Sequence, residues 1–107
     1  MKRAPRGTMM INFGEIGERL MGIESDFTYP VMLALFSKCK SNNYSRITPK
    51  AIAEHIGVSE VIVNKEIETL HEAGIVKPTK GKCMINPDLA YAGDWTLQKR
   101  LEYKAIA

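Results

Sequence analysis

The stretch Ile47–Asn86, ITPKAIAEHIGVSEVIVNKEIETLHEAGIVKPTKGKCMIN, decides the fold of this chain. Threonine caps helices and proline suits a first helical turn, so Thr48 and Pro49 predict the start of a short helix. Gly57 can adopt the left-handed backbone that ends a helix, and Ser59 can cap a second helix. The inner face of the second helix is predicted from apolar residues at helical spacing, namely Val63, Ile67 and Leu70.

A basic hairpin is predicted directly after these helices. Gly74 ends the second helix, Ile75 and Val76 begin a strand, residues 78–82 form a turn, and residues 83–85 form the return strand. A short helix, a tight turn, a longer helix and a hairpin follow one another in this order in winged helix-turn-helix domains. We therefore expect a mainly α fold with a small β-hairpin (α+β), a winged helix-turn-helix.

Further helices and one disordered end are predicted outside this stretch. Residues 1–10 are charged and lack periodicity, so we expect a disordered basic N-terminus. With only 107 residues in the chain, residues 11–107 are predicted to form a single winged helix-turn-helix domain. The other predicted helices cover residues 11–23, residues 28–39 with Thr28 as N-cap, and residues 95–107 with Asp94 as N-cap.

The charge of the chain is unevenly distributed. Its formal net charge is +3. From Thr48 to Val76, however, two lysines stand against five glutamates, so the two central helices carry −3 (2 − 5). The cations gather in the hairpin, in the loop before the helices and at both ends of the chain. Attraction to the phosphates of DNA would therefore have to come mainly from the hairpin, the loop and the ends.

The solvent face near the start of the second helix is the part of a helix-turn-helix that enters the major groove. In this geometry Asn64 can pair with adenine, and Lys65 can reach guanine or a phosphate. Val61 or Ile62 can touch a thymine methyl group, and Glu60 can accept a hydrogen bond from cytosine. The alternative is that Val61 and Ile62 help to bury a dimer interface. The candidate DNA-reading residues are Ser59, Glu60, Val61, Ile62, Asn64 and Lys65.

Five cations are candidate phosphate contacts. Contacts to phosphates position a protein on DNA without reading its sequence. The alternative is a solvated hairpin whose lysines protect an edge strand from unwanted pairing. The two helices before the hairpin favour DNA contact. The candidates are Lys77, Lys80 and Lys82 in the hairpin, together with Arg46 and Lys50.

A homodimer is expected, because a chain this short buries only a modest core by itself. A two-fold dimer would also present two recognition helices to DNA. The apolar stripe of the first predicted helix and two leucines of the last helix are candidates for the contact. These residues are Phe13, Ile16, Leu20, Leu97 and Leu101, with Ile23 continuing the first stripe.

No catalytic, metal or cofactor site is expected. Residues 74–82 lack the spacing of a phosphate-binding loop, and no second histidine follows His71 and Glu72 to complete a zinc helix. Cys39 and Cys83 are far apart, which predicts reduced thiols in a cytosolic chain. No apolar run is long enough to span a membrane, and no secretory signal follows the basic start. We therefore expect a cytoplasmic protein that is not an enzyme.

Four segments carry a resemblance to a known family. They are IAEHIGVS at residues 52–59, ETLHEAGIVK at residues 68–77, GKCMINPDLAYAGD at residues 81–94 and QKRLEY at residues 98–103. The region from Arg46 to about Tyr103 resembles the RepL family of Firmicute-type plasmid replication proteins. The resemblance implies a winged-helix protein that binds plasmid or phage DNA at a replication origin and recruits host replication machinery without cutting DNA.

The N-terminal part, FGEIGERLMGIESDFTYPVMLALF at residues 13–36, allows alternatives. Its layout is similar to that of TubR-type plasmid partition adaptors, which coat tandem centromere repeats as dimers and pass the DNA to a tubulin-like filament. A partition adaptor and a transcriptional repressor are therefore the alternatives to an origin binder. A further alternative is a winged helix that contacts proteins and binds no DNA, which the acidic central helices favour.

Overall fold

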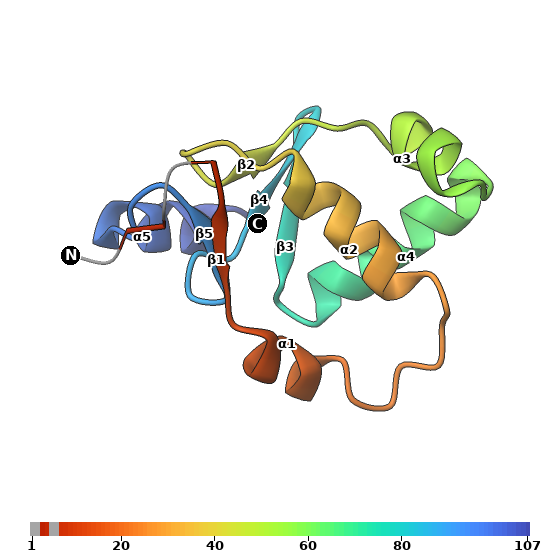
Figure 1. Cartoon of the computed structure of the whole chain (residues 1–107), viewed down its shortest axis with the longest axis horizontal. Coiled ribbons are helices and arrows are strands. Elements are labelled where there is room, and N and C mark those ends of the chain that lie inside the picture. Colours follow the sequence, from red (N-terminus) through yellow and green to blue (C-terminus); the bar gives the residue numbers. More distant parts are fainter. Residues whose placement is uncertain (1–2, 5–6) are drawn as a thin grey trace.

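The computed structural model describes residues 3–4 and 7–107, and these form an α+β fold with five helices and two small antiparallel sheets (Figure 1). The helices are α1 (Phe13–Arg19), α2 (Thr28–Ser37), α3 (Pro49–Ile56), α4 (Glu60–Glu72) and α5 (Leu97–Ala105). The strands are β1 (Met9–Ile11), β2 (Tyr44–Ser45), β3 (Val76–Thr79), β4 (Lys82–Ile85) and β5 (Ala90–Ala92).

The ends of α3 and the start of α4 are set by the local signals that the sequence carries. The side chain of Thr48 accepts a hydrogen bond from the backbone N–H of Ala51 at 3.1 Å, which caps α3. Gly57 ends α3 with a left-handed φ of 76°. Ser59 then caps α4 by accepting from the N–H of Ile62 at 3.3 Å. The predicted caps and helix boundaries are confirmed here.

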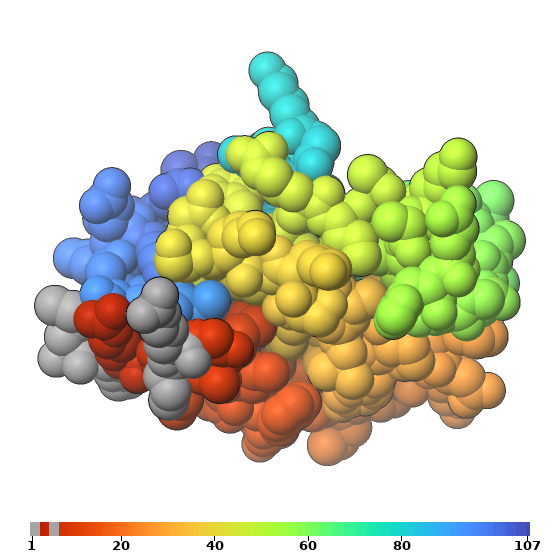
Figure 2. Space-filling model, turned by 45° about the horizontal axis from the view of Figure 1, so that its top comes forward, coloured from red at the N-terminus to blue at the C-terminus, as the bar shows by residue number. Residues whose placement is uncertain are grey.

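The predicted hairpin is also confirmed, but it belongs to a larger sheet. Strands β3 and β4 pair antiparallel, and β2 adds a third strand in the order β2-β4-β3. The short strand β2 was not predicted, since residues 40–46 look like a polar loop in the sequence. The turn between β3 and β4 projects from the body of the molecule, as the cyan segment at the top of Figure 2 shows.

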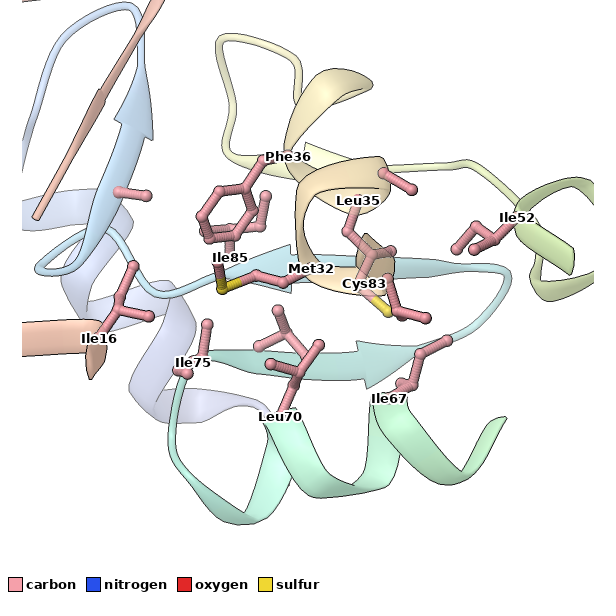
Figure 3. Packing of buried hydrophobic residues seen from close by; sticks show 14 of the residues in the cluster. Ile16, Met32, Leu35, Phe36, Ile52, Ile67, Leu70, Ile75, Cys83 and Ile85 are labelled. Atoms are coloured by element: carbon pink, nitrogen blue, oxygen red, sulfur yellow. The ribbon is translucent and has the colours of Figure 1, made fainter. Parts of the chain in front are cut away.

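The main core lies between this sheet, α2 and α4 (Figure 3). Leu35 and Phe36 of α2 lie on one side of the hairpin strands in this view, and Ile67 and Leu70 of α4 approach from the other. Ile16 of α1 closes the core at one end and is fully buried. The opposite face of the sheet packs on α5, through a smaller cluster formed by Tyr44, Met84 and Tyr103.

One buried amide joins the two sheets. Asn43 has no exposed surface and a positive φ of 69°, which a non-glycine residue rarely adopts. Its Nδ2 donates to the carbonyls of Ile85 at 2.9 Å and Ala90 at 2.8 Å. Its Oδ1 accepts from the N–H of Ala92 at 3.2 Å. The side chain therefore fastens β5 to the end of β4.

The start of the chain differs from the expected disorder. Met9 and Met10 lie in β1, which pairs antiparallel with β5 from Met9–Ala92 to Ile11–Ala90. Ala4 is buried, and Arg3 forms an isolated bridge with Asp94. Disorder is thus the wrong prediction for these described residues, because a distant strand supplies the hydrogen bonds. The part of that prediction that concerns residues 1–2 and 5–6 lies outside the described residues.

Three helices are shorter in the structure than the sequence pattern predicts. The helix predicted over residues 11–23 is limited to α1. Ile11 belongs to β1 instead, and the helix ends with Leu20 as its C-cap. Thr28 does not cap α2 but lies in its first turn, where its hydroxyl donates to Glu66 at 2.9 Å. Thr96, not Asp94, caps α5 by accepting from the N–H of Lys99 at 3.2 Å.

Candidate nucleic-acid interface

The exposed edge of α4 carries most of the predicted DNA-reading residues. Glu60, Val61, Asn64 and Lys65 are all exposed, with Val61 at 77%. Ile62 is half-buried, so only part of its side chain is available. The hydroxyl of Ser59 is used to cap the helix. Beyond this first half, the same edge continues in acidic residues, Glu68 and Glu72.

A groove of about 230 Å³ separates this part of α4 from the hairpin. Its lining combines the amide of Asn64 and the hydroxyl groups of two threonines with apolar side chains. Amides, hydroxyls and ammonium groups are the usual protein partners of phosphate oxygens and base edges. The lining includes Asn64 and Ile67 of α4, Thr48 and Pro49 at the start of α3, and Thr79, Gly81 and Lys82 of the hairpin.

Four of the five predicted phosphate contacts are accessible. Lys80 lies in the exposed β3–β4 turn, and Arg46 and Lys50 are exposed near the start of α3. Lys82 is half-buried, with its ammonium 4.0 Å from the centre of the Tyr44 ring. In the described part of the chain, none of these four forms an ion pair with an acid. Their charge is therefore not neutralised within the protein.

Lys77 is the exception among the predicted hairpin contacts. Its ammonium donates to the backbone carbonyl of Tyr103 at 2.9 Å and lies 4.6 Å from the centre of the Tyr103 ring. Lys77 pairs with Met84 in the sheet register, which directs it to the face covered by α5. The structure therefore places Lys77 in the packing of α5 rather than at the free surface of the hairpin.

The predicted dimer residues fall into two groups. Ile16 and Leu20 belong to the core of their own chain, with exposed fractions of 0% and 5%. A partner chain cannot reach them, so their assignment to a dimer contact is wrong. Phe13, Leu97 and Leu101 remain exposed at 55–58%. Phe13 lies on α1, whereas Leu97 and Leu101 lie one turn apart on α5.

Two residues that hold α4 in place were not predicted. The Glu66 carboxylate is buried on the inner side of α4 and accepts hydrogen bonds from the hydroxyls of Ser25 and Thr28. Arg19 of α1 donates to the carbonyl of Ala73 at 3.2 Å, at the C-terminal end of α4 where a cation is favourable. Glu66 lies three residues after Val63 and four before Leu70, so helical spacing indicates an inward position for it.

Burial shifts the pKa of several groups close to these surfaces. The pKa values of the Cys39 and Cys83 thiols are raised to about 11, in both cases mainly by burial. Burial also raises the pKa of Tyr103 to about 12. At neutral pH these three groups are therefore protonated, which makes them weak nucleophiles. No group of three or more His, Cys, Asp or Glu that could hold a metal is found in residues 3–4 and 7–107.

Comparison with known families places this chain among plasmid replication proteins, through a family model that matches residues 30–105. The chain belongs to the RepL family, described as Firmicute plasmid replication protein. The match runs from α2 through the candidate interface into α5, and it confirms the resemblance seen in the sequence. Comparisons with curated proteins and with solved structures gave no match. None of the described helices has the length and apolar character needed to cross a membrane.

Proposed function

We propose that this chain is a sequence-specific duplex DNA-binding protein in which α3, α4 and the β3–β4 hairpin act as a winged helix-turn-helix. The observation that carries the proposal is the groove between the exposed edge of α4 and the projecting hairpin. Its lining includes Asn64, which can read a base, together with Thr79 and Lys82 of the hairpin. Family membership supports a role for this surface in plasmid replication.

In the proposed complex the first half of α4 enters the major groove. Val61, with its high exposure, contacts a thymine methyl group, and Asn64 pairs with the N6 and N7 atoms of adenine. Lys65 reaches guanine or a phosphate, and Glu60 accepts from the N4 amine of cytosine. The capping role of Ser59 fixes where α4 begins and thus which side chains reach the base edges.

Phosphate attraction in this complex comes from residues around α4 rather than from α4 itself. Lys80 and Lys82 hold the backbone from the hairpin side, and Arg46 and Lys50 hold it near the start of α3. Residues 38–53 contain Lys38, Lys40 and these last two cations and no acid, so this segment carries +4. Such a segment supplies attraction that does not depend on DNA sequence.

The proposed target is a replication origin of a plasmid or phage, bound by a homodimer. The dimer contact that we propose uses Leu97 and Leu101 on α5, because these side chains form an exposed apolar pair. Phe13 belongs to a different surface, formed by α1 and α2. A two-fold dimer would present two α4 helices about one DNA turn apart, roughly 34 Å. A centromere-binding partition adaptor and a transcriptional repressor use the same geometry on differently arranged sites.

A protein-binding role without DNA is the second candidate, and one observation favours it. The exposed edge of α4 holds three acids, Glu60, Glu68 and Glu72, against Lys65 as its one cation. An apolar residue at its centre, Val61, would then anchor a partner protein. This candidate predicts that the hairpin lysines have no effect on affinity for nucleic acid.

Selection of duplex DNA from a random library, at about 150 mM salt to screen non-specific attraction, tests the proposal. An enriched motif is the expected result. Tandem copies of that motif in the parent replicon would indicate an origin or a centromere, whereas a single inverted repeat would indicate an operator. If the folded protein enriches no motif, sequence-specific DNA binding is refuted and the protein-binding candidate is favoured.

A further inference from the structure

An apolar surface lies away from the hairpin, on α1, α2 and the segment between them. Its side chains are exposed although they are large and apolar, with Met21 at 79% and Phe13 at 55%. Proteins that act alone rarely expose large contiguous apolar patches. We call this surface the docking face, and it comprises Phe13, Met21, Ile23, Phe27, Tyr29 and Leu33.

The helical parts of the docking face are next to one another. A methyl group at Gly17 would lie 3.9 Å from the hydroxyl of Tyr29, so α1 touches the first turn of α2 there. Phe13 lies one turn before Gly17, and Leu33 lies one turn after Tyr29. In Figure 1, α1 and the segment that follows it lie at the bottom of the molecule, and the hairpin turn lies at the top. The two surfaces therefore point to different sides.

The charge around the docking face is acidic. Residues 9–37 contain four acids and one cation, which gives −3 (1 − 4). The cation, Arg19, is occupied by Glu15 and by the carbonyl of Ala73. Glu18, Glu24 and Asp26 are exposed, and in the part of the chain that the structure describes they form no ion pair. The rim is thus negative along α1 and the segment between α1 and α2, whereas the segment 38–53, which adjoins Leu33 through Lys40, carries +4.

We propose that the docking face binds a partner protein whose contact surface has an apolar centre and a rim of lysine or arginine. Aromatic side chains at the centre of an interface supply much of its binding energy, and complementary charges at the rim select the partner. The inference rests on the proposed DNA-binding function in one respect: DNA is taken to bind on the side of α4 and the hairpin, away from the docking face. One copy of the protein would then connect DNA to this partner.

The same features argue against the other possible occupants. Phosphates are repelled by the three exposed acids, so DNA does not cover this face. In a two-fold dimer the same patch meets itself, so its acidic rim would face the acidic rim of the second copy. Like charges placed opposite one another in an interface are unfavourable.

The test compares variants of the whole chain in a minimal plasmid whose replication depends on it. Phe13→Ser with Leu33→Ser removes apolar anchors, and Glu18→Lys with Glu24→Lys reverses the rim without touching the apolar centre. Met10→Ser is the control, since Met10 is an exposed apolar residue of β1 outside the docking face. Each purified variant is checked for folding by circular dichroism, for mass by light scattering, and for affinity to the DNA motif.

The expected result is that both double variants lower plasmid copy number about ten-fold or more, as removal of interface anchors does to affinity. Their DNA affinity and mass should equal those of the wild type, and the control should change nothing. Unchanged copy number in both folded double variants would overturn the proposal. If Phe13→Ser with Leu33→Ser halves the mass in light scattering, the proposal is also overturned. In that case the docking face would be covered by a second copy of the chain and not by a different protein. Absence of DNA binding by the wild type would instead refute the proposed DNA-binding function.

Discussion

The ammonium nitrogen of Lys77 lies 2.9 Å from the carbonyl oxygen of Tyr103 and 4.6 Å from the centre of its ring. A lysine of the hairpin thereby holds the last helix of the chain, near its C-terminal end where cations are favourable. Two hairpin lysines that look equivalent in the sequence, Lys77 and Lys80, therefore have different roles. The first contacts the last helix, whereas the side chain of the second is exposed.

Replacing Lys77 with methionine separates these roles, because methionine keeps the apolar stem and removes the charge. We expect the free energy of unfolding to fall by about 1–2 kcal/mol, from the lost hydrogen bond and ring contact. DNA affinity should stay unchanged. Lys80→Met is the matched control, and it should weaken DNA binding while leaving the free energy of unfolding unchanged. Urea unfolding followed by Trp95 fluorescence and DNA titration measure the two quantities. Equal losses of DNA affinity in both variants would contradict this assignment.

Lys80→Ala combined with Lys82→Ala should weaken DNA binding to a similar extent on every sequence. Each lost phosphate contact reduces the number of counterions released, so the slope of log affinity against log salt should flatten by about one to two units. Fluorescence anisotropy titrations at several salt concentrations measure that slope. An unaltered slope would show that the hairpin does not touch the phosphates.

Asn64→Ala should behave differently from the lysine changes. A bidentate contact to adenine contributes about 1–3 kcal/mol of discrimination, so we expect this loss at one base position only. Affinities for the selected site and its single-base variants, measured with both proteins, reveal the position. If Asn64→Ala weakens binding equally on all of these sites, Asn64 does not read a base.

Two substitutions of Asn43 should separate the effect of its buried hydrogen bonds from the effect of its positive φ. Asn43→Ala removes three side-chain hydrogen bonds. It also places at a positive φ a residue that has a Cβ but no polar side chain to favour this conformation. Asn43→Gly removes the same hydrogen bonds but tolerates the backbone conformation. We expect alanine to destabilise more than glycine by about 1 kcal/mol, measured by chemical denaturation. Equal stability of the two variants would mean that the left-handed backbone carries no strain.

High pH should destabilise the fold through its buried phenols and thiols. In the unfolded chain Tyr103 titrates near 10.0, and in the folded chain burial raises its pKa to about 12. The unfolded state therefore loses its proton first, and the stability that the neutral phenol provides is lost as pH rises from 10 to 12. Tyr103→Phe removes this contribution. Its unfolding free energy should fall less steeply over that interval than that of the wild type, as pH-dependent denaturation would show.

Local signals were sufficient for the centre of the fold. Thr48, Gly57 and Ser59 act through contacts within four residues, so the sequence indicates the ends of α3 and α4 directly. The hairpin is similarly local. The RepL family was recognisable from motifs inside the same region.

Long-range pairing explains what the sequence did not reveal. Strand β1 is stabilised by β5, and β2 by β4, so neither has a signal of its own. Lys77 differs from Lys80 through its contact with Tyr103 on α5, and the spacing of residues within the hairpin cannot predict that contact. Ile16 and Leu20 look like an unpartnered stripe because their partners lie in other parts of the chain.

The pairing of Met9–Ile11 with Ala90–Ala92 has a consequence for synthesis of the protein. A ribosome makes the first strand long before the strand that it pairs with, and contacts between such distant segments form slowly. Until β5 emerges, the apolar residues Met9, Met10 and Ile11 have no partner strand and are open to wrong pairing. The α3–α4 region, whose contacts are local, can fold earlier, so closure of the β1–β5 sheet follows the folding of that region.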